Sequence, residues 1–278
     1  MSEQVLIQKS DGTNEPFAPQ KLIASLERAG ASASLSRSIL AHIERELSPG
    51  MTTASIYRHA FSFLKKHAVV PATKYSLPNA ILDFGPSGYP FEDFVAELLR
   101  AKGLSTRTRV ILKGACVEHE VDVLIEENNS RSVVEAKFHN MRGIKSDVKV
   151  ALYVAARVED LKKGPDGPIR TGWLITNTKF TEQAIRYGVC AGLSLVGWDY
   201  PAKGNLHDLI SEAGVFPLTA LTTLSAKEKR ELLARDIVLC HKLVKHEKTL
   251  REIGVSTKQI GAVFNEIGLL CGHPHGVK

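Results

Sequence analysis

Residues 121–138 carry the strongest structural signal in this sequence. They read Val-Asp-Val-Leu-Ile (121–125), then Glu-Glu-Asn-Asn-Ser (126–130), and then Val-Val-Glu-Ala-Lys-Phe (133–138). Two runs rich in β-forming residues that are joined by a short polar segment are typical of a β-hairpin. Because side chains alternate between the two faces of a strand, Glu135 and Lys137 are expected to point the same way. Asp122, on the neighbouring strand, can reach the same place.

These three side chains suggest a metal site. An acid and a lysine on one face of a core strand are costly to bury unless something binds them. Two carboxylates and one ammonium suit a Mg²⁺ (or Mn²⁺) ion and an attacking water. We therefore expect Asp122 and Glu135 to hold the metal and Lys137 to act on the water. A second interpretation stays open: Asp122 as a turn acid, and Glu135 and Lys137 as an ion pair on an edge strand.

A helix is expected upstream, over residues 88–103. Its apolar residues fall on one stripe at helical spacing: Phe91, Phe94, Val95, Leu98 and Leu99. Glu92 lies at the border of this stripe, whereas Asp93 and Glu97 lie further round the helix. Glu92 is therefore the helix acid best placed to lean over the sheet edge, as a further catalytic and metal-binding residue.

The order of these elements resembles the PD-(D/E)XK nuclease superfamily, in particular Mrr-type restriction endonucleases and archaeal Holliday junction resolvases. The resemblance covers roughly residues 88–200. It implies an α/β fold with a central mixed sheet, and Mg²⁺-dependent hydrolysis of DNA by Glu92, Asp122, Glu135 and Lys137. A helix from about residue 145 and strands near 172–180 and 193–199 fit parallel strands that finish such a sheet. Lys149, Tyr153 and Arg157 share one face of that helix, as DNA contacts or as a basic surface around a core tyrosine.

The first 84 residues are expected to form a separate, mostly helical module. Residues 5–9 are strand-like, Asp11-Gly12 is a strong hairpin turn signal, and three helices follow, the third of them after residues 52–55. The short joint at residues 83–88 separates this module from the nuclease-like part, 88–200. A third region, 201–278, is mostly helical.

The N-terminal module resembles the ATP-cone, a nucleotide-sensing domain. The resemblance rests on Ile-Gln-Lys-Ser-Asp-Gly (7–12), Glu-Pro-Phe (15–17), Lys21, Thr-Ala-Ser-Ile (53–56) and Ala-Thr-Lys-Tyr-Ser-Leu (72–77). Ser10 departs from the basic residue usual there. The resemblance implies ATP or dATP bound by a set of residues from the hairpin and helices: Lys9, Asp11, Gly12, Phe17, Lys21 and Thr53. The alternative for Thr53 is a plain helix N-cap. Since the chain has no P-loop motif, the nucleotide is expected to regulate and not to be hydrolysed.

The C-terminal region weakly resembles helix-hairpin-helix DNA-binding modules. The usual Gly-x-Gly turn is missing, because Ala234-Arg235-Asp236 stands where we expect it. A helical cap or a dimerisation element is the alternative.

The composition of the chain limits the classes of protein and of binding partner to consider. The 278 residues carry a formal charge of +6, which permits a polyanionic partner such as DNA. No apolar run approaches 18 residues, so no membrane span is expected, and the four scattered cysteines suit reduced thiols in a cytoplasm. The predicted function is a cytoplasmic, Mg²⁺-dependent DNA endonuclease regulated by ATP or dATP, and a homodimer if both strands are cut. The alternative is a non-catalytic, nucleotide-responsive DNA-binding regulator.

Overall fold

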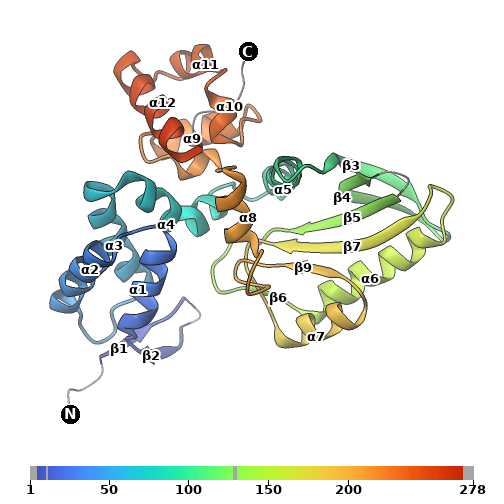
Figure 1. The fold of residues 1–278 in the computed structure, drawn as a ribbon, viewed down its shortest axis with the longest axis horizontal. Coiled ribbons are helices and arrows are strands. Elements are labelled where there is room, and N and C mark those ends of the chain that lie inside the picture. Colours follow the sequence, from blue (N-terminus) through green and yellow to red (C-terminus); the bar gives the residue numbers. More distant parts are fainter. Residues whose placement is uncertain (1–4, 11, 128–129, 272–278) are drawn as a thin grey trace.

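The structure is a computed structural model that describes residues 5–10, 12–127 and 130–271. Figure 1 shows a cluster of N-terminal helices on one side, a twisted sheet on the other, and a group of C-terminal helices above both. None of the described helices is long and apolar enough to cross a membrane.

The N-terminal module is a β-hairpin packed on four helices. Strands β1 (Leu6–Gln8) and β2 (Asn14–Pro16) pair antiparallel, and the turn between them includes Gly12 at φ +84°, a conformation that favours glycine. The helices that follow are α1 (Pro19–Arg28), α2 (Ala33–Glu46), α3 (Thr53–His67) and α4 (Val69–Leu82). Their apolar faces enclose a core of their own.

A five-stranded mixed sheet forms the centre of the second part, in the order β3-β4-β5-β7-β9. The strands are β3 (Ser105–Lys113), β4 (Glu118–Glu127), β5 (Ser130–Lys137), β7 (Ile169–Thr176) and β9 (Ser194–Val196). Strands β3, β4 and β5 run antiparallel, whereas β7 and β9 continue parallel to β5. The predicted hairpin and the α/β class with a mixed sheet are confirmed.

Helices cover both faces of this sheet. On one face α6 (Val148–Lys162) and α7 (Glu182–Cys190) pack against a core that includes Leu124 and Val133. On the other face α5 (Tyr89–Ala101) packs against Val123 and Val134. Because the central strands are buried on both faces, their sequences contain continuous runs of apolar residues. Two short strands, β6 (Lys145–Ser146) and β8 (Lys179–Phe180), pair parallel to each other.

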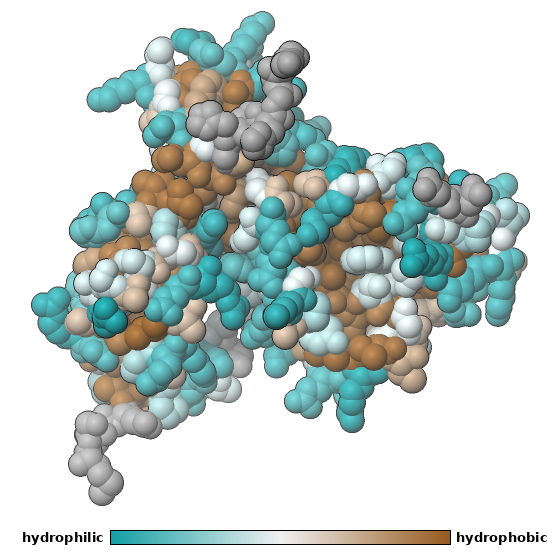
Figure 2. Space-filling model, in the orientation of Figure 1, coloured by the Kyte–Doolittle hydropathy of each residue, from teal (hydrophilic) through white to brown (hydrophobic). Residues whose placement is uncertain are grey.

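The C-terminal helices have no core of their own. They are α8 (Leu206–Ala213), the 3₁₀ turn η1 (Leu218–Ala220), α9 (Ala226–Leu233), α10 (Cys240–Leu243), α11 (Glu247–Glu252) and α12 (Thr257–Cys271). Their buried residues belong to the same apolar cluster as α5 and the adjacent sheet face. In Figure 2 apolar residues gather where α4, η1 and α9 meet.

The turn expected at residues 234–236 does not join two helices of ordinary length, because the helix after it, α10, has four residues. Further along the chain, Gly254 lies between α11 and α12 with φ +89°.

Buried Glu266 of α12 fastens this region to the N-terminal module. Its carboxylate accepts hydrogen bonds from the backbone N–H of Thr222 (2.7 Å) and of Thr223 (3.0 Å). It also accepts bonds from the hydroxyl groups of Thr223 (2.6 Å) and of Thr73 on α4 (3.3 Å).

Candidate active site

Asp122 and Glu135 lie where the ladder between β4 and β5 ends. The register runs from Glu127 opposite Ser130 to Val123 opposite Val134, and Asp122 and Glu135 are the next residues along the two strands. At this point the backbone N–H of Ala136 donates a 2.7 Å hydrogen bond to Oδ2 of Asp122. This bond holds the Asp122 carboxylate against β5.

Glu135 is held from the face of the sheet that α6 covers. Nη1 of Arg157, on α6, donates a 2.6 Å hydrogen bond to Oε2 of Glu135, and both side chains are more than four-fifths buried. The Arg157 guanidinium also lies 4.6 Å from the ring centroid of Tyr153. Tyr153 itself is half exposed, so the alternative of a core tyrosine is wrong. Arg157 turns into the site instead of outward.

The charges of these groups act on one another. Burial raises the pKa of Asp122, and the Ala136 hydrogen bond and the charges of Arg157 and Lys137 work against this rise. Burial also raises the pKa of Glu135, the charge of Asp122 raises it further, and Arg157 and Lys137 again oppose. Lys137 therefore lies within electrostatic reach of both acids.

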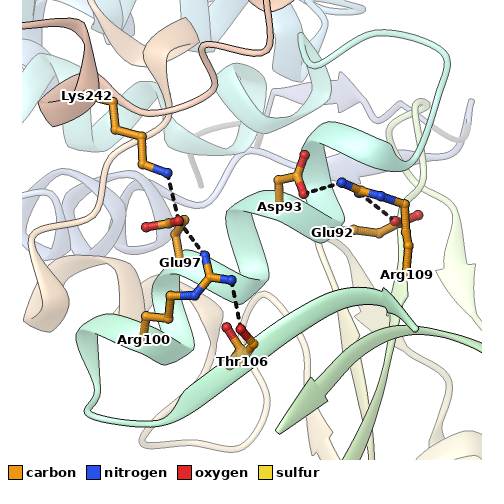
Figure 3. Close-up of polar contacts among 7 residues, drawn as sticks. All are labelled: Glu92, Asp93, Glu97, Arg100, Thr106, Arg109 and Lys242. Atoms are coloured by element: carbon orange, nitrogen blue, oxygen red, sulfur yellow. Dashed lines mark hydrogen bonds and ion pairs between the residues drawn. The ribbon is translucent and has the colours of Figure 1, made fainter. Parts of the chain in front are cut away.

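Glu92 approaches from the opposite side of the sheet. It lies in the first turn of α5, and its pKa is raised to about 7, first by burial and then by the charge of Asp122. Arg109 of β3 contacts Glu92 at 3.3 Å and Asp93 at 3.0 Å (Figure 3). Arg109 has φ +53°, unusual for a residue with a side chain, in the middle of its strand.

The donor set fits a hard divalent cation, because carboxylate oxygens are the ligands that Mg²⁺ and Mn²⁺ prefer. The three acids are nevertheless held apart. Within residues 5–10, 12–127 and 130–271, Glu92, Asp122 and Glu135 do not bring three ligand atoms within 4.8 Å of one another. Arg109 and Arg157 each hold one acid on its own side. A cation at this site would have to draw the acids together against these two ion pairs.

A second polar network lies just beyond Lys137. The backbone N–H of His139 donates to Oδ1 of Asn177, and Nδ2 of Asn177 donates to the His139 carbonyl, both at 2.8 Å. Nε2 of His139 lies 3.0 Å from Oγ of Ser146. Burial, followed by the charge of Lys137, lowers the pKa of His139. His139 is half-buried.

The residues expected to bind nucleotide lie around the hairpin. Lys9 and Lys21 converge on Glu15, with Nζ–Oε distances of 3.3 and 3.5 Å. Phe17 is half-buried against the core of the module. Gly12 lies in the turn, and Asp11 lies outside the described residues.

The N-cap of α3 is Thr52, whose hydroxyl accepts a 3.1 Å hydrogen bond from the Ser55 N–H. Thr53 is the first helical residue, so the plain N-cap alternative for Thr53 is wrong. The error is one residue, because both positions carry a threonine that suits a cap.

One contact between the modules is not predictable from the sequence. Arg142, in the segment after β5, lies 5.3 Å from the ring centroid of Tyr57 on α3. The Tyr57 ring stacks on Tyr75 of α4 at 5.1 Å. The segment that follows Lys137 therefore touches the N-terminal module, and in Figure 1 the ends of β5 and β7 point toward it. No local pattern signals a contact between residues so far apart in the chain.

Two family models and two relatives match parts of this chain. Residues 86–199 match the Mrr catalytic family, described as a restriction endonuclease, and residues 216–271 match the AF1548-like C-terminal family. An uncharacterised protein of Archaeoglobus fulgidus is 38% identical over 180 residues, which are 64% of this chain and 100% of that protein. The crystal structure of AF1548, a protein of unknown function, is 37% identical with a TM-score of 0.54; the match covers 67% of this chain and 99% of that one.

This chain belongs to the AF1548 family. Within it, residues 86–199 form a restriction-endonuclease-like domain of the PD-(D/E)XK type, with the C-terminal helices packed on the α5 side.

Proposed function

We propose that this member of the AF1548 family is a metal-dependent DNA endonuclease that acts in the cytoplasm and responds to ATP or dATP. The observation that carries the proposal is the meeting of Asp122, Glu135 and Lys137 at the end of the β4–β5 ladder, in a restriction-endonuclease-like domain.

In the proposed mechanism Asp122 and Glu135 would hold Mg²⁺ or Mn²⁺, and Glu92 would complete the set from α5. A bound cation would supply charge neutralisation at the scissile phosphate and a lowered pKa for its bound water. The ammonium of Lys137 donates a hydrogen bond to the attacking water or to the phosphate. On metal binding, Glu135 and Glu92 would exchange part of their contacts with Arg157 and Arg109 for the cation.

The DNA would be bound mainly through its phosphates, as the charge of +6 favours. Affinity is therefore expected to fall as salt rises. Cutting both strands would require two copies of the domain, which makes a homodimer part of the proposal.

Lys9 and Lys21 support the nucleotide part of the proposal. Both ammonium groups lie against Glu15, and a triphosphate bearing more negative charge would compete with that single carboxylate. Gly12, Phe17 and Thr53, together with Asp11, would complete the site.

The test is a nicking assay with Mg²⁺ on duplex, branched and methylated DNA, with and without ATP or dATP. Glu135→Ala and Lys137→Ala should abolish cleavage and leave retardation of DNA in a gel largely intact. Glu127→Ala, at the far end of the same ladder, is the matched control and should cut normally. Unchanged cleavage in both site variants would rule this site out.

One observation favours the alternative, a non-catalytic, nucleotide-responsive DNA-binding regulator. Arg157 and Arg109 already balance Glu135 and Glu92 without a cation. If no tested DNA is cut under any metal or nucleotide condition while binding still responds to nucleotide, the regulator is the better account.

A further inference from the structure

A group of two histidines and one glutamate lies on the N-terminal module, apart from the candidate active site. His42 and Glu46 are on α2, and His59 is on α3. One ligand atom from each of the three lies within 4.8 Å of the others, and among the described residues this is the group with that property. We propose that His42, Glu46 and His59 bind a zinc ion.

The local geometry suits this ion. His42 and Glu46 are four residues apart, so one helical turn places both on the same face of α2. Nε2 of His42 lies 3.5 Å from Oε1 of Glu46, and Nδ1 of His59 contacts Oε2 of the same carboxylate. Ligand atoms about 2.0–2.1 Å from a tetrahedral zinc ion stand about 3.3 Å apart, close to the His42–Glu46 spacing. A small movement of His59 would complete the arrangement.

The histidine rings are positioned by packing. The His42 ring lies 5.5 Å from the ring of Phe63 and 6.3 Å from that of His59. The side chains of His42, Glu46 and His59 are 30–41% exposed, so an ion from solution can reach them. Ordered ring positions lower the entropy that metal binding must overcome.

The chemistry of the ligands separates this site from the candidate active site. Two imidazoles and one carboxylate suit zinc, whereas the all-carboxylate set of Glu92, Asp122 and Glu135 suits Mg²⁺. In Figure 1, α2 lies at the outer side of the molecule, away from the five-stranded sheet. The zinc site is therefore independent of the proposed cleavage reaction, and failure of one would not imply failure of the other.

Three protein ligands leave one tetrahedral position free. His42 and His59 line a cavity of about 400 Å³ together with Arg58, Ser62, Phe63, Lys66 and His67. The two cationic side chains of this cavity favour an anion or a polarised water as the fourth ligand. The bound ion would link α2 to α3 and stabilise the N-terminal module.

The experiment is a zinc titration of the full-length protein after dialysis against a chelator, followed by calorimetry and by the shift in thermal unfolding midpoint. Wild type should bind zinc at this site and unfold at a higher temperature with it. His42→Ala and His59→Ala should each weaken this binding at least tenfold and remove the zinc-dependent shift. Cobalt, added as a spectroscopic probe, should give the visible absorption of a tetrahedral site in wild type and lose it in both variants.

Three controls isolate the site. His67→Ala changes a histidine of the same cavity outside the cluster, Asp122→Asn removes a candidate active-site ligand, and a His273→Ala/His275→Ala variant removes the histidines of the C-terminal tail. All three should keep the zinc affinity, the thermal shift and the cobalt spectrum. Wild-type affinity in both His42→Ala and His59→Ala, or loss of binding only in Asp122→Asn or the tail variant, would overturn the proposal. Circular dichroism of the variants without metal distinguishes lost ligands from lost folding.

Discussion

Arg157 of α6 donates a 2.6 Å hydrogen bond to Glu135 of β5, and this ion pair sits where the proposed metal would bind. The guanidinium gives the largely buried Glu135 carboxylate an ion-pair partner. It does for Glu135 what Arg109 does for Glu92 on the other side of the sheet. Glu135 and Glu92 are therefore each paired with an arginine in the absence of a cation.

Arg157→Ala should therefore lower the free energy of unfolding in the absence of Mg²⁺ by about 2–3 kcal/mol, because it leaves a largely buried carboxylate unpaired. Added Mg²⁺ should recover more stability in this variant than in wild type, since the cation replaces the missing charge. Urea unfolding with and without Mg²⁺ measures both effects. The control Arg235→Ala removes an exposed ion pair with Glu252 and should cost less than about 1 kcal/mol. An equal response to Mg²⁺ in Arg157→Ala and wild type would place the cation elsewhere.

The raised pKa of Glu92, about 7, predicts a dependence of stability on pH. The folded protein holds this proton more tightly than the unfolded chain, so between about pH 4.5 and pH 7 the contribution of Glu92 to stability falls as pH rises. Glu92→Gln abolishes this fall, and should gain about 1–3 kcal/mol relative to wild type between pH 5 and pH 8. Chemical unfolding at the two pH values gives the comparison.

Asp93→Asn is the matched control, because Asp93 neighbours Glu92 and binds the same arginine. It should not show this gain. If Glu92→Gln and wild type have the same free energy of unfolding at pH 5 and at pH 8, Glu92 is ionised at both pH values. The charge of Asp122 then does not raise its pKa.

The contact of Arg142 with Tyr57 predicts how the two modules communicate. Arg142→Ala should retain cleavage without nucleotide but lose at least half of the response to ATP or dATP, because the segment after Lys137 no longer touches α3. Tyr57→Leu should behave alike, since it removes the ring and keeps an apolar side chain. Cleavage rates with and without dATP are the measurement, and Arg45→Ala, an exposed arginine on α2, is the control. A full nucleotide response in both contact variants would show that the signal takes another route.

Glu266 predicts a large effect on stability far from any proposed chemistry. Glu266→Ala leaves the N–H groups of Thr222 and Thr223 without their acceptor and removes the bond to Thr73, so it should cost about 3 kcal/mol. Glu252→Ala, which loses exposed ion pairs with Arg235 and Lys248, should cost less than about 1 kcal/mol. Thermal unfolding monitored by circular dichroism compares them. Similar costs for the two would mean that the Glu266 network is not intact in solution.

The sequence alone determined what depends on neighbours along the chain. The pairing of β4 with β5 follows from two β-rich runs around a polar turn, and the alternation of side chains then places Glu135 and Lys137 on one face. The stripe from Phe91 to Leu99 likewise determined that α5 is buried on one side and that Glu92 stands at its border. These are short-range regularities of strands and helices, which a sequence displays directly.

Which charged side chains form ion pairs in the site depends on the tertiary structure. Arg157 is 22 residues from Glu135 and Arg109 is 17 from Glu92, separations with no helical or strand period. The joining of the C-terminal helices to the core of α5 and the contact of Arg142 with Tyr57 are equally invisible in sequence. Such contacts depend on how whole elements pack, because the free energy gained by burying apolar faces selects one arrangement and the polar side chains then pair within it.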